Sequence, residues 1–307
     1  MERIKGYLKK LGKILRKPEM TILPSSFAFN IILAIIPLLT IVVLIASYFD
    51  ISIDLVGKMV SEVMPQQVSE VIIGVISGKG FDKSVGFFNI VAFILASNGT
   101  YAIINTSNAL YQIKERDYLK DRISSIILLF IIIILFVFLL IVPIFGDNII
   151  KLMASAKILA SFTDDAMIIF NFVKWPLTIM IIYLNIKLIY TIAPSKNIKS
   201  EETTYGATFT TFGWILATLI FKFYLKHFAR YDIIYGNLAA IIIMMVWMYF
   251  LSYIFVLGMA INASRREERE IIEETMRIER EKIEAAMKKE KKKKKVKKEK
   301  KEKSEDK

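Results

Sequence analysis

The long apolar runs of this chain limit what it can fold into. Six runs of about 20 residues or more lack the strand and turn signals that interrupt the core segments of soluble domains. A helix of that length crosses about 30 Å of hydrocarbon at about 1.5 Å per residue. The sequence therefore predicts an all-α fold, a polytopic helical membrane protein with six transmembrane helices. The predicted spans are residues 25–49, 86–110, 123–145, 168–193, 205–225 and 235–262.

The segment between the first two spans is too polar to cross a membrane. Apolar residues recur there at helical spacing in two stretches, 53–63 and 68–75, which Pro65 separates. This pattern predicts two short amphipathic helices on the outer face. Inside the first span, Pro37 predicts a kink that a membrane helix tolerates.

The distribution of Lys and Arg predicts the orientation. The net charge is +13, and the basic residues gather in the N-terminal segment, in the loops at 114–122 and 196–199, and in the C-terminal tail. The positive-inside rule then places these segments, and both termini, in the cytoplasm of a protein of the cell membrane. An even number of spans agrees with that orientation. We expect a retained signal anchor, because the first apolar run has full membrane length.

Both ends of the chain are basic. Residues 1–20 form the first predicted segment, amphipathic and cytoplasmic; it either lies on an anionic inner leaflet or is a solvated leader that orients the first span. Residues 21–263 form the six-span domain, and residues 264–307 form a cytoplasmic tail rich in Lys and Glu. We read the tail as a single charged helix that frays into disorder rather than a coiled coil, because its apolar seam is too sparse. The expected partners are the bilayer and anionic lipids at both termini, with no specific nucleic acid, and a homo-oligomer remains open.

Polar residues inside the predicted spans are the candidate functional residues, because each costs free energy in hydrocarbon unless it is paired. With both termini in the cytoplasm, most of them fall in the cytoplasmic half of the bilayer. They predict a polar cavity, open to the cytoplasm, that binds a hydrophilic substrate or a lipid head group. The alternative is that the amides only join helices, and Lys187 could be a counter-ion or reach the interface. The cavity candidates are Asn30, Asn98, Tyr101, Asn105, Asn108, Lys187, Thr208 and Asn262, with Asn185 and Thr211 as further polar positions.

Residues for covalent or metal chemistry are sparse in this sequence. The chain has no Cys and one His, His227, with no acid or Ser at a catalytic spacing. The spans contain no paired carboxylates, and nucleotide-binding and metal-ligand spacings are absent. We therefore expect no enzyme activity, no cofactor and no metal site.

The last span carries the most specific motif of the sequence. It reads Tyr235-Gly236-Asn237-Leu238-Ala239-Ala240, then Trp247, then Leu257-Gly258-Met259-Ala260-Ile261-Asn262. This motif, with the first-span run that ends at Pro37, resembles the YihY/BrkB family of membrane proteins over roughly residues 20–263. The motif residues are Pro37, Tyr235, Gly236, Trp247 and Gly258. The chain departs from the family at Asn30, where an aromatic residue is usual, and before Asn262, where an acidic residue is common.

The resemblance implies a six-span inner-membrane fold without a defined activity. Names used in the family include a virulence factor and a ribonuclease, and the residues give the second name no support. A transporter or lipid-handling role is the expectation from the architecture. The alternative is a non-catalytic envelope scaffold whose basic tail recruits partners or anionic lipid.

Overall fold

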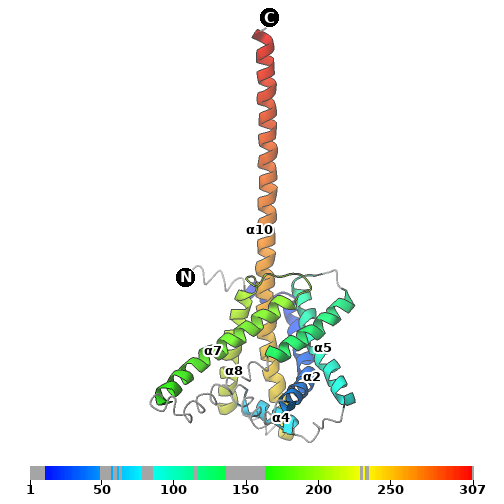
Figure 1. Ribbon diagram of the computed structural model, residues 1–307, viewed down its shortest axis with the longest axis vertical. Helices are drawn as coiled ribbons and strands as arrows, with labels where there is room; N and C mark the ends of the chain where they lie inside the picture. Colours follow the sequence, from blue (N-terminus) through cyan, green and yellow to red (C-terminus); the bar gives the residue numbers. More distant parts are fainter. Residues whose placement is uncertain are drawn as a thin grey trace. The chain divides into compact units, whose positions relative to one another are not determined.

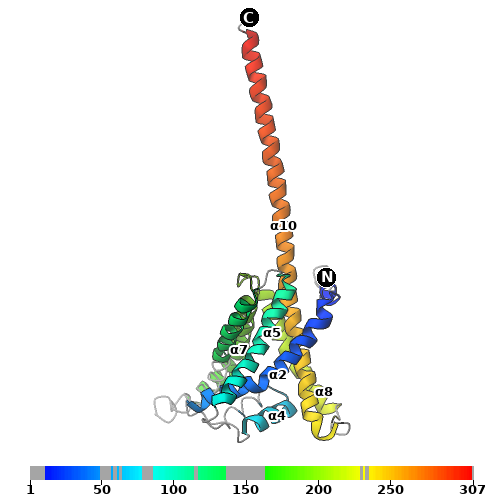
Figure 2. The same ribbon diagram turned by 90° about the vertical axis from the view of Figure 1, so that its right-hand side faces the viewer.

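In the computed structural model, the described residues are 11–48, 57, 61, 64–77, 86–113, 117–135, 163–228, 231 and 235–305. Their regular secondary structure is helical, with no strand among them. Residues 118–135 are also helical, at the start of the third predicted span. Figures 1 and 2 show the helices from two directions. Their bounds are α2 Glu19–Tyr48, α4 Gln66–Ser77, α5 Gly86–Leu110, α7 Thr163–Ile192, α8 Thr204–His227, the 3-10 turn η1 Gly236–Leu238, and α10 Ala239–Glu305.

Two described helices are long and apolar enough to cross a membrane, Thr204–His227 and Ala239–Glu284. Glu19–Ile35 and Pro176–Ile192 are shorter apolar helices. The all-α prediction is confirmed for the described residues, while the number of six spans stays a prediction. Two predicted segments lie partly outside the described residues: the third span at residues 136–145, and the N-terminal segment at residues 1–10.

The prolines inside the helices do not interrupt them. α2 continues through Pro24 and Pro37, and α7 continues through Pro176. A membrane helix tolerates proline because neighbouring groups can satisfy the carbonyl that the missing N–H leaves open. Residues 25–48 of the predicted first span therefore lie in one helix of 30 residues.

The packing of α2 against α5 depends on small residues. A Cβ atom at Gly99 of α5 would lie only 2.6 Å from the Cβ of Ala34 in α2. Small residues let two helix backbones approach closely, which is the main source of packing energy between helices in lipid. The two helices lie next to each other in Figure 2.

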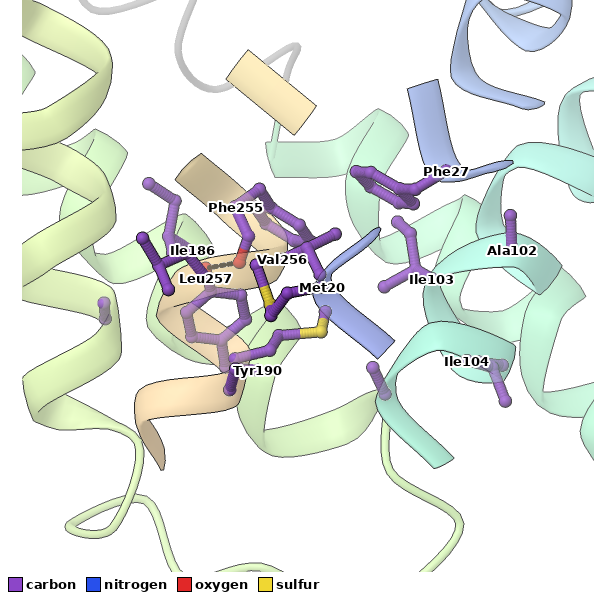
Figure 3. Packing of buried hydrophobic residues seen from close by; sticks show 14 of the residues in the cluster. Met20, Phe27, Ala102, Ile103, Ile104, Ile186, Tyr190, Phe255, Val256 and Leu257 are labelled. Atoms are coloured by element: carbon purple, nitrogen blue, oxygen red, sulfur yellow. Dashed lines mark hydrogen bonds between the residues drawn. The ribbon is translucent and has the colours of Figure 1, made fainter. Parts of the chain in front are cut away.

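The largest apolar cluster is centred on Phe255 of α10. Its ring stacks on Phe27 of α2 at 5.1 Å between centroids, and it contacts Tyr190 of α7 at 4.9 Å and Trp214 of α8 at 5.8 Å. Figure 3 shows Phe27, Tyr190 and Phe255 together with buried residues of α5. This cluster joins α2, α5, α7, α8 and α10 with the helix of residues 118–135.

A second apolar cluster packs α4 against the C-terminal part of α8 and the N-terminal part of α10. Val68 and Ile72 of α4 are buried there with Phe221 of α8 and Trp247 of α10. α4 is the short amphipathic helix that the sequence predicts after Pro65, and its apolar face supplies this contact. The cluster fixes α4 near the end of α8, away from the N-terminus of that helix.

The chain divides into two compact units, Met1–Asn262 and Ala263–Lys307. In the second unit, the side chains from Glu267 to Glu284 are all exposed. Two ion pairs at i,i+4 spacing join Arg266 to Glu270 and Arg277 to Glu281. Such pairs on an exposed helix each contribute about 0.3–0.5 kcal/mol, so they support the helix only weakly.

Candidate functional site

A buried carboxylate, Asp121, lies at the centre of a hydrogen-bond network that joins three segments. Ser195, in the loop between α7 and α8, donates from Oγ to Asp121 Oδ1 at 2.6 Å. Asn108 of α5 donates from Nδ2 to Ser195 Oγ at 2.7 Å and to Asp121 Oδ2 at 3.4 Å. The backbone N–H of Ser195 donates to Asn108 Oδ1 at 2.8 Å. We call Asn108, Asp121 and Ser195 the carboxylate network.

The end of α5 explains how Asn108 and Asp121 meet. Gln112 adopts a left-handed conformation with φ of 54°, and the N–H of Ile113 bonds the carbonyl of Asn108 at 3.0 Å. A left-handed residue after the last turn is a common way to end a helix and to reverse the chain. The next helix then begins at residue 118, where the side chain of Asp117 accepts the N–H of Leu119 at 3.0 Å as an N-cap. Asp121 follows one turn later and faces α5.

Burial makes the carboxylate network expensive to build. Asn108 is 0% exposed and Asp121 is 3% exposed. A carboxylate removed from water costs several kcal/mol unless hydrogen bonds replace its hydration. The hydroxyl of Ser195 and the amide of Asn108 supply such bonds. Losing either partner would therefore leave a buried charge with incomplete hydrogen bonding.

A cation lies on the adjacent side of the same helix. Arg122 donates from Nη1 to Oδ1 of Asn98 in α5 at 2.9 Å. Its guanidinium carbon lies 5.8 Å from the centroid of the Tyr101 ring, a cation–π distance. Tyr118 packs edge-on against Tyr101 at 6.0 Å between centroids. Two of the predicted cavity residues, Asn98 and Tyr101, therefore meet at a cation that the sequence analysis used only for orientation.

A third polar group joins α7 to α8 and α10. The hydroxyl of Tyr190 donates to the carbonyl of Phe255 at 2.7 Å and lies 2.7 Å from Thr210 Oγ1. Figure 3 marks the bond between Tyr190 and Phe255. All three residues are buried, so the phenol hydroxyl is satisfied inside the apolar cluster.

Asn262 joins α10 to the start of α8. Its Oδ1 accepts the N–H of Gly206 at 2.7 Å, and its Nδ2 donates to the carbonyl of Thr203 at 3.2 Å. The residue before α8, Thr203, makes no capping bond with its own side chain. The amide of Asn262 therefore satisfies one of the N–H groups that the first turn of a helix leaves open. In this arrangement Asn262 holds two helices together.

The remaining cavity candidates are Asn30, Asn105, Lys187 and Thr208. Asn30 and Thr208 bond carbonyls of their own helices, those of Ser26 and Thr204. Lys187 is half-buried, with Nζ 5.9 Å from the Tyr183 ring centroid. Asn105 is half-buried on α5 and also makes a polar interaction. Whether these side chains line a cavity stays a prediction.

The residues of the family motif differ in their surroundings. Pro37 is buried, Tyr235 is exposed, and Gly236 has a positive φ of 52° that favours glycine. Trp247 is 4% exposed, and its Nε1 has no hydrogen-bond partner in the described part of the chain. A Cβ at Gly258 would lie 2.6 Å from the Tyr190 hydroxyl, so glycine is needed for the close contact of α10 with α7 and α8.

Sequence reasoning missed Asp121, Arg122, Ser195 and Tyr190. The first two lie in the basic loop before an apolar run, where charges usually mark the membrane interface. An acid among basic residues is the one signal that could have pointed to Asp121, and nothing near Ser195 indicated its partner. Within the described ranges, no group of three His, Asp or Glu side chains could hold a metal ion.

Comparison with known proteins gives the family. The sequence model of the family described as "Virulence factor BrkB" matches residues 15–284. The chain belongs to this family. It is 27% identical over 273 residues to a protein named ribonuclease-like protein YfkH of Bacillus subtilis, covering 88% of this chain and 98% of that protein. No solved structure matches.

Other relatives carry a membrane name. A UPF0761 membrane protein of Haemophilus influenzae is 26% identical over 251 residues, which is 80% of this chain and 88% of the relative. One of Glaesserella parasuis is 29% identical over 181 residues, which is 57% of this chain and 60% of the relative. These relatives and the apolar helices identify the chain as a membrane protein of the BrkB/UPF0761 family.

Proposed function

We propose that this membrane protein is a transporter or lipid-handling protein whose polar path opens to the cytoplasm. The observation that supports the proposal is the buried Asp121 in the carboxylate network. Ionisable residues inside membrane domains are rare because they are expensive, and they commonly mark substrate or ion pathways. A network used only to join helices could be built from amides and hydroxyls, without a charge.

The carboxylate network has the form of a joint that can open. Asn108 and Asp121 lie on two neighbouring helices, whereas Ser195 lies on the exposed loop between α7 and α8. Moving this loop breaks the bonds of Ser195 to both partners together and lets water or a polar head group reach Asp121. Such an element, with two discrete arrangements, is what a transport cycle requires.

The cytoplasmic orientation in this proposal comes from charge. The loop that carries Ser195 also carries Lys196 and Lys199, and the loop before Asp121 carries Lys114 and Arg116. The positive-inside rule therefore favours the cytoplasmic side for the carboxylate network. An aqueous path would then reach Asp121 from the cytoplasm.

A matched pair of substitutions tests the proposal. Asp121→Asn keeps the shape of the side chain but removes its charge, while Asp117→Asn changes an exposed cap to a residue that caps equally well. Each full-length variant is reconstituted in liposomes that contain phospholipid with a fluorescent head group. Chemical quenching of the outer leaflet then measures how fast the lipid crosses the bilayer.

We expect the wild-type protein and Asp117→Asn to make lipid cross the bilayer faster than it does in protein-free liposomes. We expect Asp121→Asn to reduce this added rate at least tenfold. Equal rates for Asp121→Asn and wild type, at equal reconstitution, would contradict a role for the carboxylate network. No acceleration by the wild-type protein would contradict lipid handling.

The second candidate is a non-catalytic envelope scaffold that acts through its tail. It is favoured by the exposed, charged helix of the second unit, where no described side chain from Glu267 to Glu284 is buried. A variant that lacks residues 265–307, reconstituted in the same liposomes, separates the two functions. We expect this variant to keep the wild-type rate of lipid crossing, and a loss of crossing would favour the hypothesis that the protein acts through its tail.

A further inference from the structure

The guanidinium of Arg122 is held by Asn98 and Tyr101, and several of its N–H donors have no acceptor among the described residues. Asn98 accepts one of its N–H groups, and the Tyr101 ring lies beside it. A guanidinium carries five N–H donors in a rigid planar arrangement that suits phosphate oxygens. Asn98 supplies the only side-chain acceptor recorded for Arg122 within the described ranges, and the Arg122 side chain is half-buried. The Arg122 guanidinium is therefore positioned to bind an anion.

The described acids near Arg122, Asp117 and Asp121, are engaged by other groups. Asp121 points its carboxylate into the network with Asn108 and Ser195. Asp117 uses Oδ1 to cap the helix that carries Arg122. Lys120, two residues before Arg122, is exposed and projects from the opposite side of the helix at 3.6 residues per turn.

Apolar residues cover the surface next to Arg122 on two adjoining helices. On residues 118–135, Arg122 lies at the border between the face packed on α5 and an exposed apolar face at 3.6 residues per turn. On α5, Asn98 lies within a second exposed apolar face. The two helices contact through Phe93 and Phe130 at 5.4 Å between ring centroids. The exposed apolar residues are Leu119, Ile123, Ile127, Phe130 and Ile134 on the first helix, and Val91, Ile94 and Leu95 on α5.

Aromatic residues mark the head-group end of this surface. Tyr118 is 65% exposed and packs edge-on against Tyr101. Tyrosine is enriched at membrane interfaces, where its ring lies among acyl chains and its hydroxyl reaches the head groups. A cation, an interfacial tyrosine and two adjoining apolar faces together match the parts of a phospholipid molecule.

We propose that Arg122, Asn98 and Tyr118 form a binding site for one anionic phospholipid of the bilayer. Arg122 contacts the phosphate, Tyr118 lies at the head-group level, and the acyl chains follow the exposed faces of α5 and residues 118–135. The positive charge of Arg122 favours an anionic head group, while the apolar faces favour a lipid over a free phosphate. The site needs only that the chain is embedded in a membrane, so it goes beyond the proposed function and does not rest on transport.

Native mass spectrometry of the full-length protein tests the site. The wild type, Arg122→Gln and the matched control Lys120→Gln are each equilibrated with equal amounts of phosphatidylglycerol and phosphatidylcholine in detergent. Basic residues at the two ends of the chain are the same in all three proteins, so any lipid they attract is a common background. We expect Arg122→Gln to lose about one bound phosphatidylglycerol, and Lys120→Gln to keep the wild-type number.

Three outcomes would overturn the lipid site. Arg122→Gln could retain as many phosphatidylglycerol molecules as the wild type. Phosphatidylcholine could depend on Arg122 to the same extent, which would show that the site does not select an anionic phospholipid. Inorganic phosphate at millimolar concentration could displace the lipid that depends on Arg122, which would indicate a site for a free anion.

A second measurement uses the unmodified protein, so it does not depend on how Arg122→Gln folds. Phosphatidylglycerol with a photoreactive acyl chain is added to the wild type and illuminated. We expect crosslinks in residues 91–98 and 118–135, and crosslinks confined to other helices would contradict the site. Loss of lipid crossing in Asp121→Asn tests the transport proposal alone, so either proposal can fail while the other stands.

Discussion

At the scale of single residues, one amide can decide how two helices meet. Asn262 uses both of its polar atoms, accepting from Gly206 and donating to Thr203, which lie 56 and 59 residues earlier in the chain. Because the amide is 1% exposed, water cannot replace either bond when the side chain is removed.

Asn262→Ala should therefore lower the stability of the protein by about 1–3 kcal/mol. Asn185→Ala is the control, because Asn185 bonds only a carbonyl of its own helix, that of Ile181. Size-exclusion chromatography of samples heated in detergent gives the melting temperature of each variant and so measures the difference. A control that melts as early as Asn262→Ala would show that the contact between the helices is unimportant.

A second residue-scale prediction concerns two glycines. A Cβ at Gly258 would meet the Tyr190 hydroxyl at 2.6 Å and the Gly206 carbonyl oxygen at 2.9 Å, and it would approach Thr210 Oγ1 still more closely. A Cβ at Gly74 of α4 would meet nothing within 4 Å. Gly258→Ala should lower the melting temperature strongly through overpacking, whereas Gly74→Ala should leave it unchanged or raise it. Equal melting of the two variants would be inconsistent with the close packing of α7, α8 and α10.

At this scale the sequence allowed only part of the site to be predicted. Asn108 and Asn262 were singled out because amides in apolar runs are costly, and both are buried and hydrogen-bonded. Their partners could not be predicted, since Ser195 lies 87 residues from Asn108 and the pairing depends on how the helices pack. Asp121 was missed because its place beside a basic loop suggested the interface.

At the scale of helices, the positions of the elements could be read from the apolar runs. α5, α8 and α10 each begin within a few residues of a predicted span. Which helices contact each other was not predictable, because every face of a membrane helix is apolar and periodicity then carries little information. Specific contacts come instead from single residues, as between Phe255 and the rings of Phe27 and Tyr190.

Two tryptophans give a prediction about these contacts. Trp214 of α8 donates from Nε1 to the carbonyl of Leu251 in α10 at 2.8 Å, whereas Nε1 of the buried Trp247 has no partner among the described residues. Trp214→Phe should therefore cost about 1 kcal/mol more than Trp247→Phe, because only the first change breaks a hydrogen bond. Melting temperatures of the two variants measure this difference. A larger loss for Trp247→Phe would indicate that its N–H has a partner in the folded protein.

At the scale of the whole membrane unit, polar and apolar contacts lie at opposite ends of α8. Its N-terminus at Thr203 and Gly206 is held by Asn262, and its C-terminal residues Phe221 and Leu225 pack on α4. The 22 rises from Thr203 to Leu225 cover about 33 Å at 1.5 Å each, close to the thickness of the hydrocarbon core. This length agrees with a chain that crosses the membrane, with the loop of Ser195 on one side and α4 on the other.

Labelling of single cysteines tests whether the protein spans the membrane with its carboxylate network at the cytoplasmic side. The chain has no cysteine of its own, so Lys199→Cys, in the loop of Ser195, and Glu70→Cys, on α4, each provide one exposed thiol. A membrane-impermeant maleimide is added to intact spheroplasts and to permeabilised ones. We predict labelling of Glu70→Cys in intact spheroplasts and of Lys199→Cys only after permeabilisation. The reverse pattern, or labelling of both positions from the same side, would rule out a cytoplasmic Ser195 loop with α4 on the opposite side.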